Sequence, residues 1–280
     1  PAFGQGQVNV YNWSDYIAED QLKKFEQDTG IKVNYTTYDS NEILEAKLRA
    51  GRAGYDVVVP TASPFFVRQL AAGLYEPLDK ARLRNLKNLD PEIMGALAKY
   101  DPGNAHAIPW MWGTTGVGYN DEKVAEIMPD APVDSLRMVF DPQIVEKFAS
   151  CGVGMLDDAE QVLGLALIYL GLNPDTTDKA ELEKAVDVVT KVRPYVRKFH
   201  SSSYVNDLAD GGLCLAIGFS GDMLIASSRA KEAGKPFTVT YRLSKEGNLV
   251  WTDVLAIPAV ASHPQAAHAF IDFFMRPEVG

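Results

Sequence analysis

The chain has few of the residues that metal centres and nucleic-acid-binding surfaces require. Its 280 residues include only two cysteines and four histidines. The histidines do not have the spacing of metal ligands, so we expect no metal site. Acidic residues outnumber basic residues by 37 to 27, which gives a net charge of −10. Because nucleic-acid-binding surfaces are basic, this balance argues against a nucleic-acid partner, and it is compatible with a cationic ligand.

The signatures of common enzyme classes and of membrane spans are also absent. No P-loop or Gly-x-Gly-x-x-Gly motif follows a predicted strand, and there is no Gly-x-Ser-x-Gly elbow. Ser201 beside His200 is interpreted as a helix cap rather than a nucleophile. No apolar run reaches the length of about 18 residues that a transmembrane helix needs. We therefore expect a protein that is not an enzyme and has no cofactor. Since the chain starts without a signal-peptide pattern, we interpret it as mature or trimmed.

What is present is the pattern of an α/β protein. The composition, 46% hydrophobic and 23% charged, is typical of a soluble globular protein, and the length suits two domains. Strand patterns at 8–11, 31–35 and 55–60 alternate with helix patterns, which predicts βαβ units. The continuous apolar runs at 55–60 and 213–219 are typical of strands buried on both faces.

The first strand leads into a stretch rich in turn and capping residues, Asn12-Trp13-Ser14-Asp15-Tyr16. In open α/β sheets, ligands bind in loops of this kind at the carboxyl ends of strands. Aromatic rings beside a carboxylate suit a ligand with a cationic amine and an apolar stem. The alternative interpretation is a capped helix start with two core aromatics.

Other strand ends carry similar groups, with almost no lysine or arginine among them. They are Thr61 and Ser63; Asp157, Asp158 and Glu160; Phe219 and Asp222; and Trp251 and Asp253. Together these groups suggest a cleft for a diammonium ligand. Helix capping is the alternative for each carboxylate and is favoured for Asp157, and Trp251 has the alternative of a core aromatic.

The two cysteines, Cys151 and Cys214, are far apart in the sequence. A single pair fits one disulfide in an oxidising compartment, and two buried free thiols are equally consistent with the sequence.

Seven stretches resemble the polyamine-binding (putrescine/spermidine) substrate-binding proteins of bacterial ABC importers. They are residues 11–17, 38–42, 56–63, 109–120, 199–202, 216–222 and 251–258. The resemblance covers essentially the whole chain. It implies an α/β, two-lobed periplasmic-binding-protein-like fold with two crossover hinge segments, placed near 109–114 and 251–253. Lobe 1 is expected at 1–109 and 252–280, and lobe 2 at 110–251. Relatives continue beyond the position of Gly280, so the C-terminal part of the second lobe is expected to be missing.

The resemblance also implies a ligand site and a disulfide between Cys151 and Cys214. The positions that match the family's site are Trp13, Ser14, Asp15, Tyr16, Thr61, Ser63, Asp158, Phe219, Asp222, Trp251 and Asp253. Trp13, Tyr16, Phe219 and Trp251 would form aromatic walls, and Asp222 and Asp253 would pair with ammonium groups. Gln161 stands where relatives often have a ligand-binding glutamate, and Phe219 stands where a tryptophan is common.

The expected function is therefore a periplasmic polyamine-binding protein, monomeric, that delivers its ligand to the membrane permease of an ABC importer. Trp251 and Asp158 resemble members that bind longer polyamines, whereas Asp222 resembles the putrescine type, and the sequence leans to spermidine. The alternatives are a polyamine sensor that signals to a membrane receptor, the same fold with another amine as ligand, and an enzyme that uses a two-lobed cleft.

Overall fold

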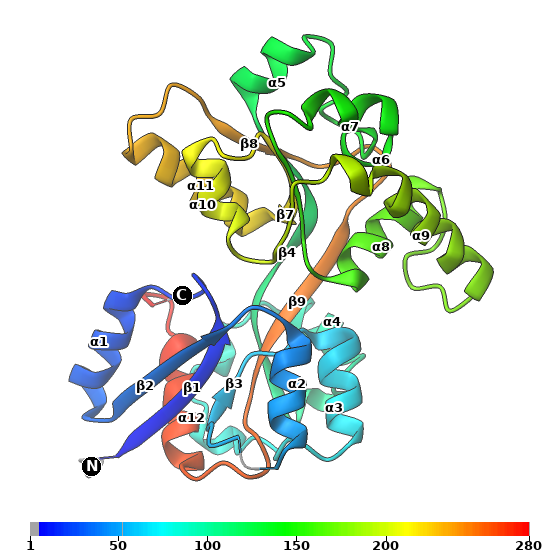
Figure 1. Cartoon of the computed structure of the whole chain (residues 1–280). Coiled ribbons are helices and arrows are strands. Elements are labelled where there is room, and N and C mark those ends of the chain that lie inside the picture. The colour runs from blue at the N-terminus through cyan, green and yellow to red at the C-terminus, as the bar shows by residue number, and fades with distance from the viewer. Residues whose placement is uncertain (1–5, 52, 280) are drawn as a thin grey trace. The chain divides into compact units, whose positions relative to one another are not determined.

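The computed structural model describes residues 6–51 and 53–279 and divides the chain into two compact units (Figure 1). Unit 1 comprises the residues up to Trp112 and those from Trp251 onward, and unit 2 comprises Gly113–Val250. Two strands contain the boundaries between the units: β4 (Ala107–Asn120) and β9 (Leu249–Ala256). Each unit is described by itself below.

Unit 1 alternates strands and helices, as the sequence patterns predict. Its elements, besides its parts of β4 and β9, are β1 (Gln7–Trp13), α1 (Glu19–Thr29), β2 (Lys32–Tyr38), α2 (Asn41–Arg49), β3 (Val57–Val58), α3 (Val67–Ala71), α4 (Pro91–Leu97) and α12 (Pro264–Phe274). β1 pairs in parallel with β2 and with β3, and β9 runs antiparallel to β3. The carboxyl ends of the three parallel strands therefore share one edge of the sheet, where the predicted site residues of this unit begin.

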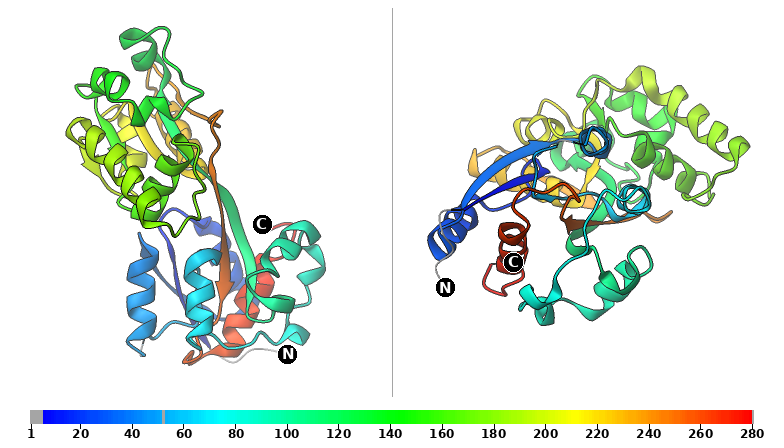
Figure 2. Two further views of the ribbon diagram at one scale, coloured as in Figure 1. Left: turned by 90° about the vertical axis from the view of Figure 1, so that its right-hand side faces the viewer. Right: turned by 90° about the horizontal axis from the view of Figure 1, so that it is seen from below.

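Both faces of the unit 1 sheet are covered, because alternate strand residues point to opposite sides. Val10 belongs to a core that α1 and α12 complete through Phe25 and Phe270, whose ring centroids lie 5.4 Å apart. Tyr11 belongs to a second core, which includes Leu44 of α2. Figure 2 shows α1 and α12 on the same side of the strands. The buried sheet holds the strand ends in fixed positions.

Unit 2 is built around its own strands. Its elements are α5 (Asp121–Ile127), α6 (Arg137–Phe140), α7 (Pro142–Phe148), β5 (Val153–Met155), α8 (Ala159–Tyr169), α9 (Lys179–Val192), β6 (Lys198–Phe199), α10 (Tyr204–Asp210), β7 (Leu215–Phe219), α11 (Ser220–Glu232) and β8 (Val239–Arg242). β5 is parallel to β6 and to β7, and β4 is antiparallel to β7 and β8. The carboxyl ends of β5, β6 and β7 therefore share an edge.

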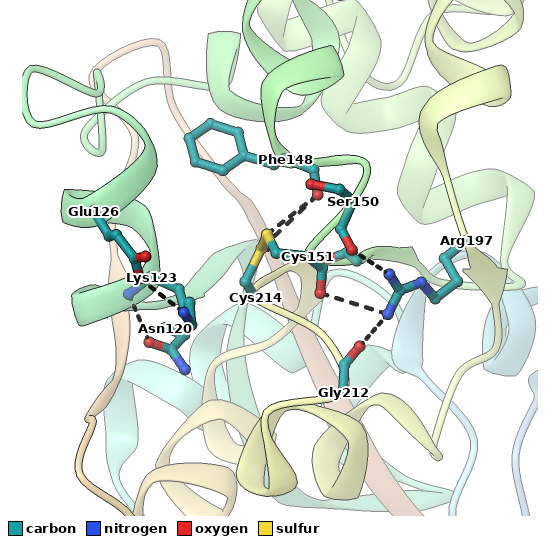
Figure 3. The surroundings of a disulfide bond; sticks show 10 residues. Asn120, Lys123, Glu126, Phe148, Ser150, Cys151, Arg197, Gly212 and Cys214 are labelled. Atoms are coloured by element: carbon teal, nitrogen blue, oxygen red, sulfur yellow. Dashed lines mark hydrogen bonds and ion pairs between the residues drawn. A yellow bond between two sulfur atoms is a disulfide. The ribbon is translucent and has the colours of Figure 1, made fainter.

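A disulfide joins Cys151 to Cys214 in unit 2, with 5.7 Å between the two Cα atoms, and confirms the implied pairing (Figure 3). It closes a loop with a sequence separation of 63, which in the chain-entropy model contributes about 4 kcal/mol. The Arg197 guanidinium reinforces the same region by donating to the carbonyl oxygens of Ser150 (2.7 Å) and Gly212 (2.6 Å). The covalent and polar links together fix the start of β7.

Candidate functional site

Asp253 is the centre of a polar cluster in unit 1. Its side chain is buried, with the residue only 5% exposed. The Tyr16 hydroxyl donates to Oδ2 (2.8 Å), and the Thr61 hydroxyl donates to Oδ1 (2.7 Å). Asn41 fixes Thr61 in turn, because its Nδ2 donates to Thr61 Oγ1 and its Oδ1 accepts from the Thr61 amide, both at 3.0 Å. Each carboxylate oxygen of Asp253 thus has a hydroxyl donor.

The sheet explains why residues so distant in sequence meet here. Thr61 follows the end of β3 and forms an antiparallel bridge with Asp253 of β9. Tyr16 follows β1, whose carboxyl end lies at the same edge because β1 and β3 are parallel. The hydrogen bonds to Asp253 therefore join three chain segments.

Burial changes the acid–base behaviour of this carboxyl group. It raises the pKa of Asp253 from 3.8 to about 6, and the hydrogen bonds from Thr61 and Tyr16 oppose part of that rise. A buried carboxylate without a cationic partner is costly. The ionised Asp253 is therefore ready to pair with a positively charged ligand.

Two of the predicted site residues in this unit are tryptophans, Trp13 and Trp251. The Trp13 indole Nε1 donates to the Val59 carbonyl oxygen (2.9 Å), and the Trp13 ring packs against Tyr38 with 4.7 Å between centroids. Tyr38 also donates to the Val59 carbonyl through its hydroxyl. Trp251 is half-buried on β9, two residues before Asp253, so both side chains point to the same face of the strand. Trp13 is a fixed ring at the end of β1.

The remaining predicted residues of unit 1 lie in more exposed positions. Ser14 donates from Oγ to Asp39 Oδ1 (2.9 Å). Asp15 is exposed and has φ 53°, in the left-handed region that aspartate tolerates better than most residues. Ser63 is also exposed. The structure therefore joins Tyr16 and Thr61 directly to Asp253 and gives Ser14 a different carboxylate partner.

In unit 2, Asp158 and Gln161 lie at the start of α8. Asp158 is the N-cap, and its Oδ1 accepts from the Gln161 amide (3.1 Å). The buried Thr115 hydroxyl donates to Gln161 Oε1 (2.6 Å). Thr115 of β4 is paired in register with Phe219 of β7. Three of the four predicted residues of this unit are thus close to one another through β4 and β7.

Tyr204 joins the fourth, Asp222, to Phe219. Its hydroxyl accepts from the Phe219 amide (3.0 Å) and donates to Asp222 Oδ2 (2.6 Å). Burial, and then the charge of Asp222, hold the pKa of Tyr204 well above its ordinary value. The phenol therefore remains a protonated donor.

Four residues that organise these clusters were not predicted as site residues: Tyr38, Asn41, Thr115 and Tyr204. Ser201 was predicted only as a helix cap. Ser201 follows β6, and its Oγ is buried and has no hydrogen-bond partner among the described residues. The parallel pairing of β5, β6 and β7 places this loop at the edge that also carries Asp158 and Asp222. The position of Ser201 after a strand end was the sequence feature that could have marked it as a site residue. No local sequence pattern indicates the hydrogen-bond partners of Tyr38, Asn41, Thr115 and Tyr204.

The interpretation of Ser201 as a helix cap was wrong. The His200 ring accepts at Nδ1 from the amides of Ser202 (3.1 Å) and Ser203 (3.2 Å), just before α10 begins at Tyr204. The imidazole therefore satisfies the amides at the start of this helix.

Across residues 6–51 and 53–279, no group of three or more His, Cys, Asp or Glu side chains could hold a metal ion. No helix in the described part of the chain combines the length and apolar character needed to cross a membrane.

Comparisons with known proteins agree with this architecture. Residues 20–279 match the family described as bacterial extracellular solute-binding protein. The chain is 53% identical over 273 residues to the putrescine-binding periplasmic protein SpuD of Pseudomonas aeruginosa, covering 97% of this chain and 74% of that protein. It is 49% identical over 277 residues to the putrescine-binding periplasmic protein PotF of Escherichia coli, covering 98% and 75%.

A solved structure described as a spermidine/putrescine ABC transporter from Listeria monocytogenes has a TM-score of 0.85 and 33% identity, covering 98% of this chain and 79% of that one. The predicted α/β periplasmic-binding-protein-like fold is confirmed by this likeness, and the expected periplasmic location by the family and the two periplasmic relatives. The chain belongs to the bacterial extracellular solute-binding protein family.

Proposed function

We propose that this chain binds a polyamine and delivers it to the membrane permease of an ABC importer. The observation that carries the proposal is Asp253, a buried carboxylate with hydroxyl donors on both oxygens and a pKa of about 6. Such a group gains most from a ligand that brings a positive charge. Relatives named for putrescine binding support the choice of a polyamine as that ligand.

In this proposal Asp253 and Asp222 are each a candidate partner for an ammonium group of the ligand. The rings of Trp13, Tyr16, Phe219 and Trp251 pack on the methylene groups and attract the charge. Polar contacts come from Ser14, Asp15, Thr61, Ser63, Asp158 and Gln161. The buried Oγ of Ser201 is a further candidate, because a ligand could give it the hydrogen bond that the described residues do not. Gln161 contributes a neutral amide, which weakens attraction for an ammonium group at that position.

The ligand that we favour is a putrescine-class diamine. The sequence favoured spermidine because of Trp251 and Asp158, and that preference is not confirmed. The relatives at 53% and 49% identity are named for putrescine, whereas one named for spermidine and putrescine, from Escherichia coli, is 35% identical. Asp222 agrees with the putrescine type.

Units 1 and 2 are, in this proposal, the two lobes of the binding protein, and β4 and β9 are the crossover segments. The predicted lobe bounds, 1–109 with 252–280 and 110–251, stay a prediction and differ from the unit bounds by one to three residues. We further propose that the chain acts as a monomer and performs no catalysis.

The test is calorimetric titration of ligand-free protein with putrescine, cadaverine, spermidine and spermine. Putrescine should bind, and Asp253→Ala should weaken that binding by about 2–5 kcal/mol, the range for removing one partner of a buried charge pair. Asp130→Ala, which removes an exposed carboxylate, is the control and should leave the affinity unchanged. No heat from any of the four amines would refute the function. Tighter binding of spermidine than of putrescine would refute only the choice of ligand.

A further inference from the structure

We propose that Tyr204 is a positioning residue for ligand binding, which holds the Asp222 carboxylate and the Phe219 backbone in the geometry that the ligand meets. The inference rests on the proposed polyamine function and assigns a role within that site to a residue placed beneath it.

One phenol oxygen makes both contacts. It accepts a hydrogen bond from the Phe219 amide and donates one to Asp222 Oδ2, at 3.0 Å and 2.6 Å. Phe219 ends β7, and Asp222 lies in the first turn of α11, so the hydroxyl connects the strand to the helix that follows it. The phenol therefore couples the position of the ring proposed to contact the ligand to that of the proposed ammonium partner.

The core of unit 2 fixes the Tyr204 ring itself. Tyr204 is only 2% exposed. A Cβ atom on Gly218 would lie 2.3 Å from Tyr204 Cε2 and 2.7 Å from Cζ, and 2.6 Å from Met223 Cε. These distances are shorter than any van der Waals contact, so the ring occupies space that only a glycine in β7 leaves. A ring confined in this way can restrain the carboxylate that it contacts.

The charge arrangement suits this role. Burial, and then the charge of Asp222, hold the pKa of Tyr204 well above its ordinary value, so the phenol keeps the proton that it donates to Asp222. A donor to a carboxylate favours its ionised form, the form that attracts an ammonium group. Unit 1 has the same arrangement, in which the Tyr16 hydroxyl donates to Asp253.

The test is a double-mutant cycle of Tyr204→Phe and Asp222→Asn, with putrescine as the titrant in calorimetry. Tyr204→Phe alone should weaken binding about tenfold, the effect expected for losing a hydrogen bond to a charged group. In the Asp222→Asn background the same change should weaken binding by clearly less than tenfold, because the carboxylate is already neutral and only the effect through the Phe219 backbone remains. A merely structural role would give equal losses in both backgrounds, and that result would overturn the inference.

The matched control is Tyr119→Phe. Tyr119 is also buried in unit 2, and its hydroxyl accepts from Arg242 Nε (3.1 Å). The affinity of this variant should equal that of the parent chain. An equal weakening by both tyrosine changes, or none by Tyr204→Phe, would contradict the inference.

If Tyr204→Phe does not fold, Gly218→Ala takes its place in the cycle, because it keeps the phenol but displaces the ring. It should also weaken binding in the parent background and have a clearly smaller effect in Asp222→Asn, and equal losses would again overturn the inference. A parent chain that binds no polyamine would instead be a failure of the proposed function, which this titration detects separately.

Discussion

Replacing Asp253 by asparagine should stabilise the ligand-free protein at neutral pH. The pKa of Asp253 rises from 3.8 to about 6 in the fold. The pKa rises by about 2, and each pKa unit corresponds to about 1.4 kcal/mol, so keeping Asp253 ionised in the folded protein costs about 3 kcal/mol. Asparagine removes this charge. Its carbonyl and amide groups can still form hydrogen bonds with Thr61 and Tyr16.

The gain should depend on pH in a defined direction. Between pH 3.8 and about 6 the unfolded chain has lost the Asp253 proton while the folded chain keeps it. The unfolded state then binds fewer protons, so the contribution of Asp253 to stability falls as the pH rises through this window. The advantage of Asp253→Asn should be close to zero at pH 4, increase up to pH 6 and reach at most about 3 kcal/mol above it.

Urea unfolding followed by circular dichroism, on protein freed of ligand by unfolding and refolding, measures this difference at each pH. Asp130→Asn is the control, since it makes the same chemical change at an exposed position and should produce no such pH dependence. A difference between Asp253→Asn and the parent chain that does not vary with pH, or a variant less stable throughout, would refute the reasoning.

Two further predictions concern the pH dependence of ligand binding and the disulfide. The affinity for putrescine should fall as the pH drops below about 6. At pH 5 it should be about tenfold weaker, because about one Asp253 in ten is then ionised. Titrations across pH 5–8 measure this, and an affinity that does not change with pH would contradict the pairing with Asp253. Replacing Cys151 and Cys214 together by serine should lower the free energy of unfolding by about 4 kcal/mol. Urea unfolding measures this difference. A loss below about 1 kcal/mol would show that the disulfide contributes little to stability.

Local patterns predicted the elements well where one residue type decides a boundary. Helix α1 ends where Gly30 takes φ 70°, a left-handed cap that glycine adopts without strain. The cap of α8 is Asp158, whose side chain accepts from the helix, and not Asp157, for which the sequence favoured capping. The apolar run at 213–219 contains β7. Such features depend on neighbours in the sequence and can be inferred from it.

The site was predicted only in part, since the sequence identifies candidate groups without their partners. Their positions at strand ends marked Asp253 and Thr61 as candidates. Those positions did not indicate that the Thr61 hydroxyl donates to the Asp253 carboxylate. Tyr204 lies within a short amphipathic helix and has no local signal of a role. Asn41 is the first residue of α2, and its side-chain amide holds Thr61, which lies far along the chain.

The sequence by itself determined the α/β class, the strand ends at which polar groups collect and the acidic, lysine-poor character of those groups. Only the tertiary structure decided which hydroxyl meets which carboxylate. Tyr16 and Thr61 contact Asp253 across sequence separations of 237 and 192 residues. Such pairings depend on how strands far apart in the chain are brought together, and the raised pKa of Asp253 depends on the burial that results. Neither the contact nor the burial can be read from a local pattern, because both are properties of the packed sheet.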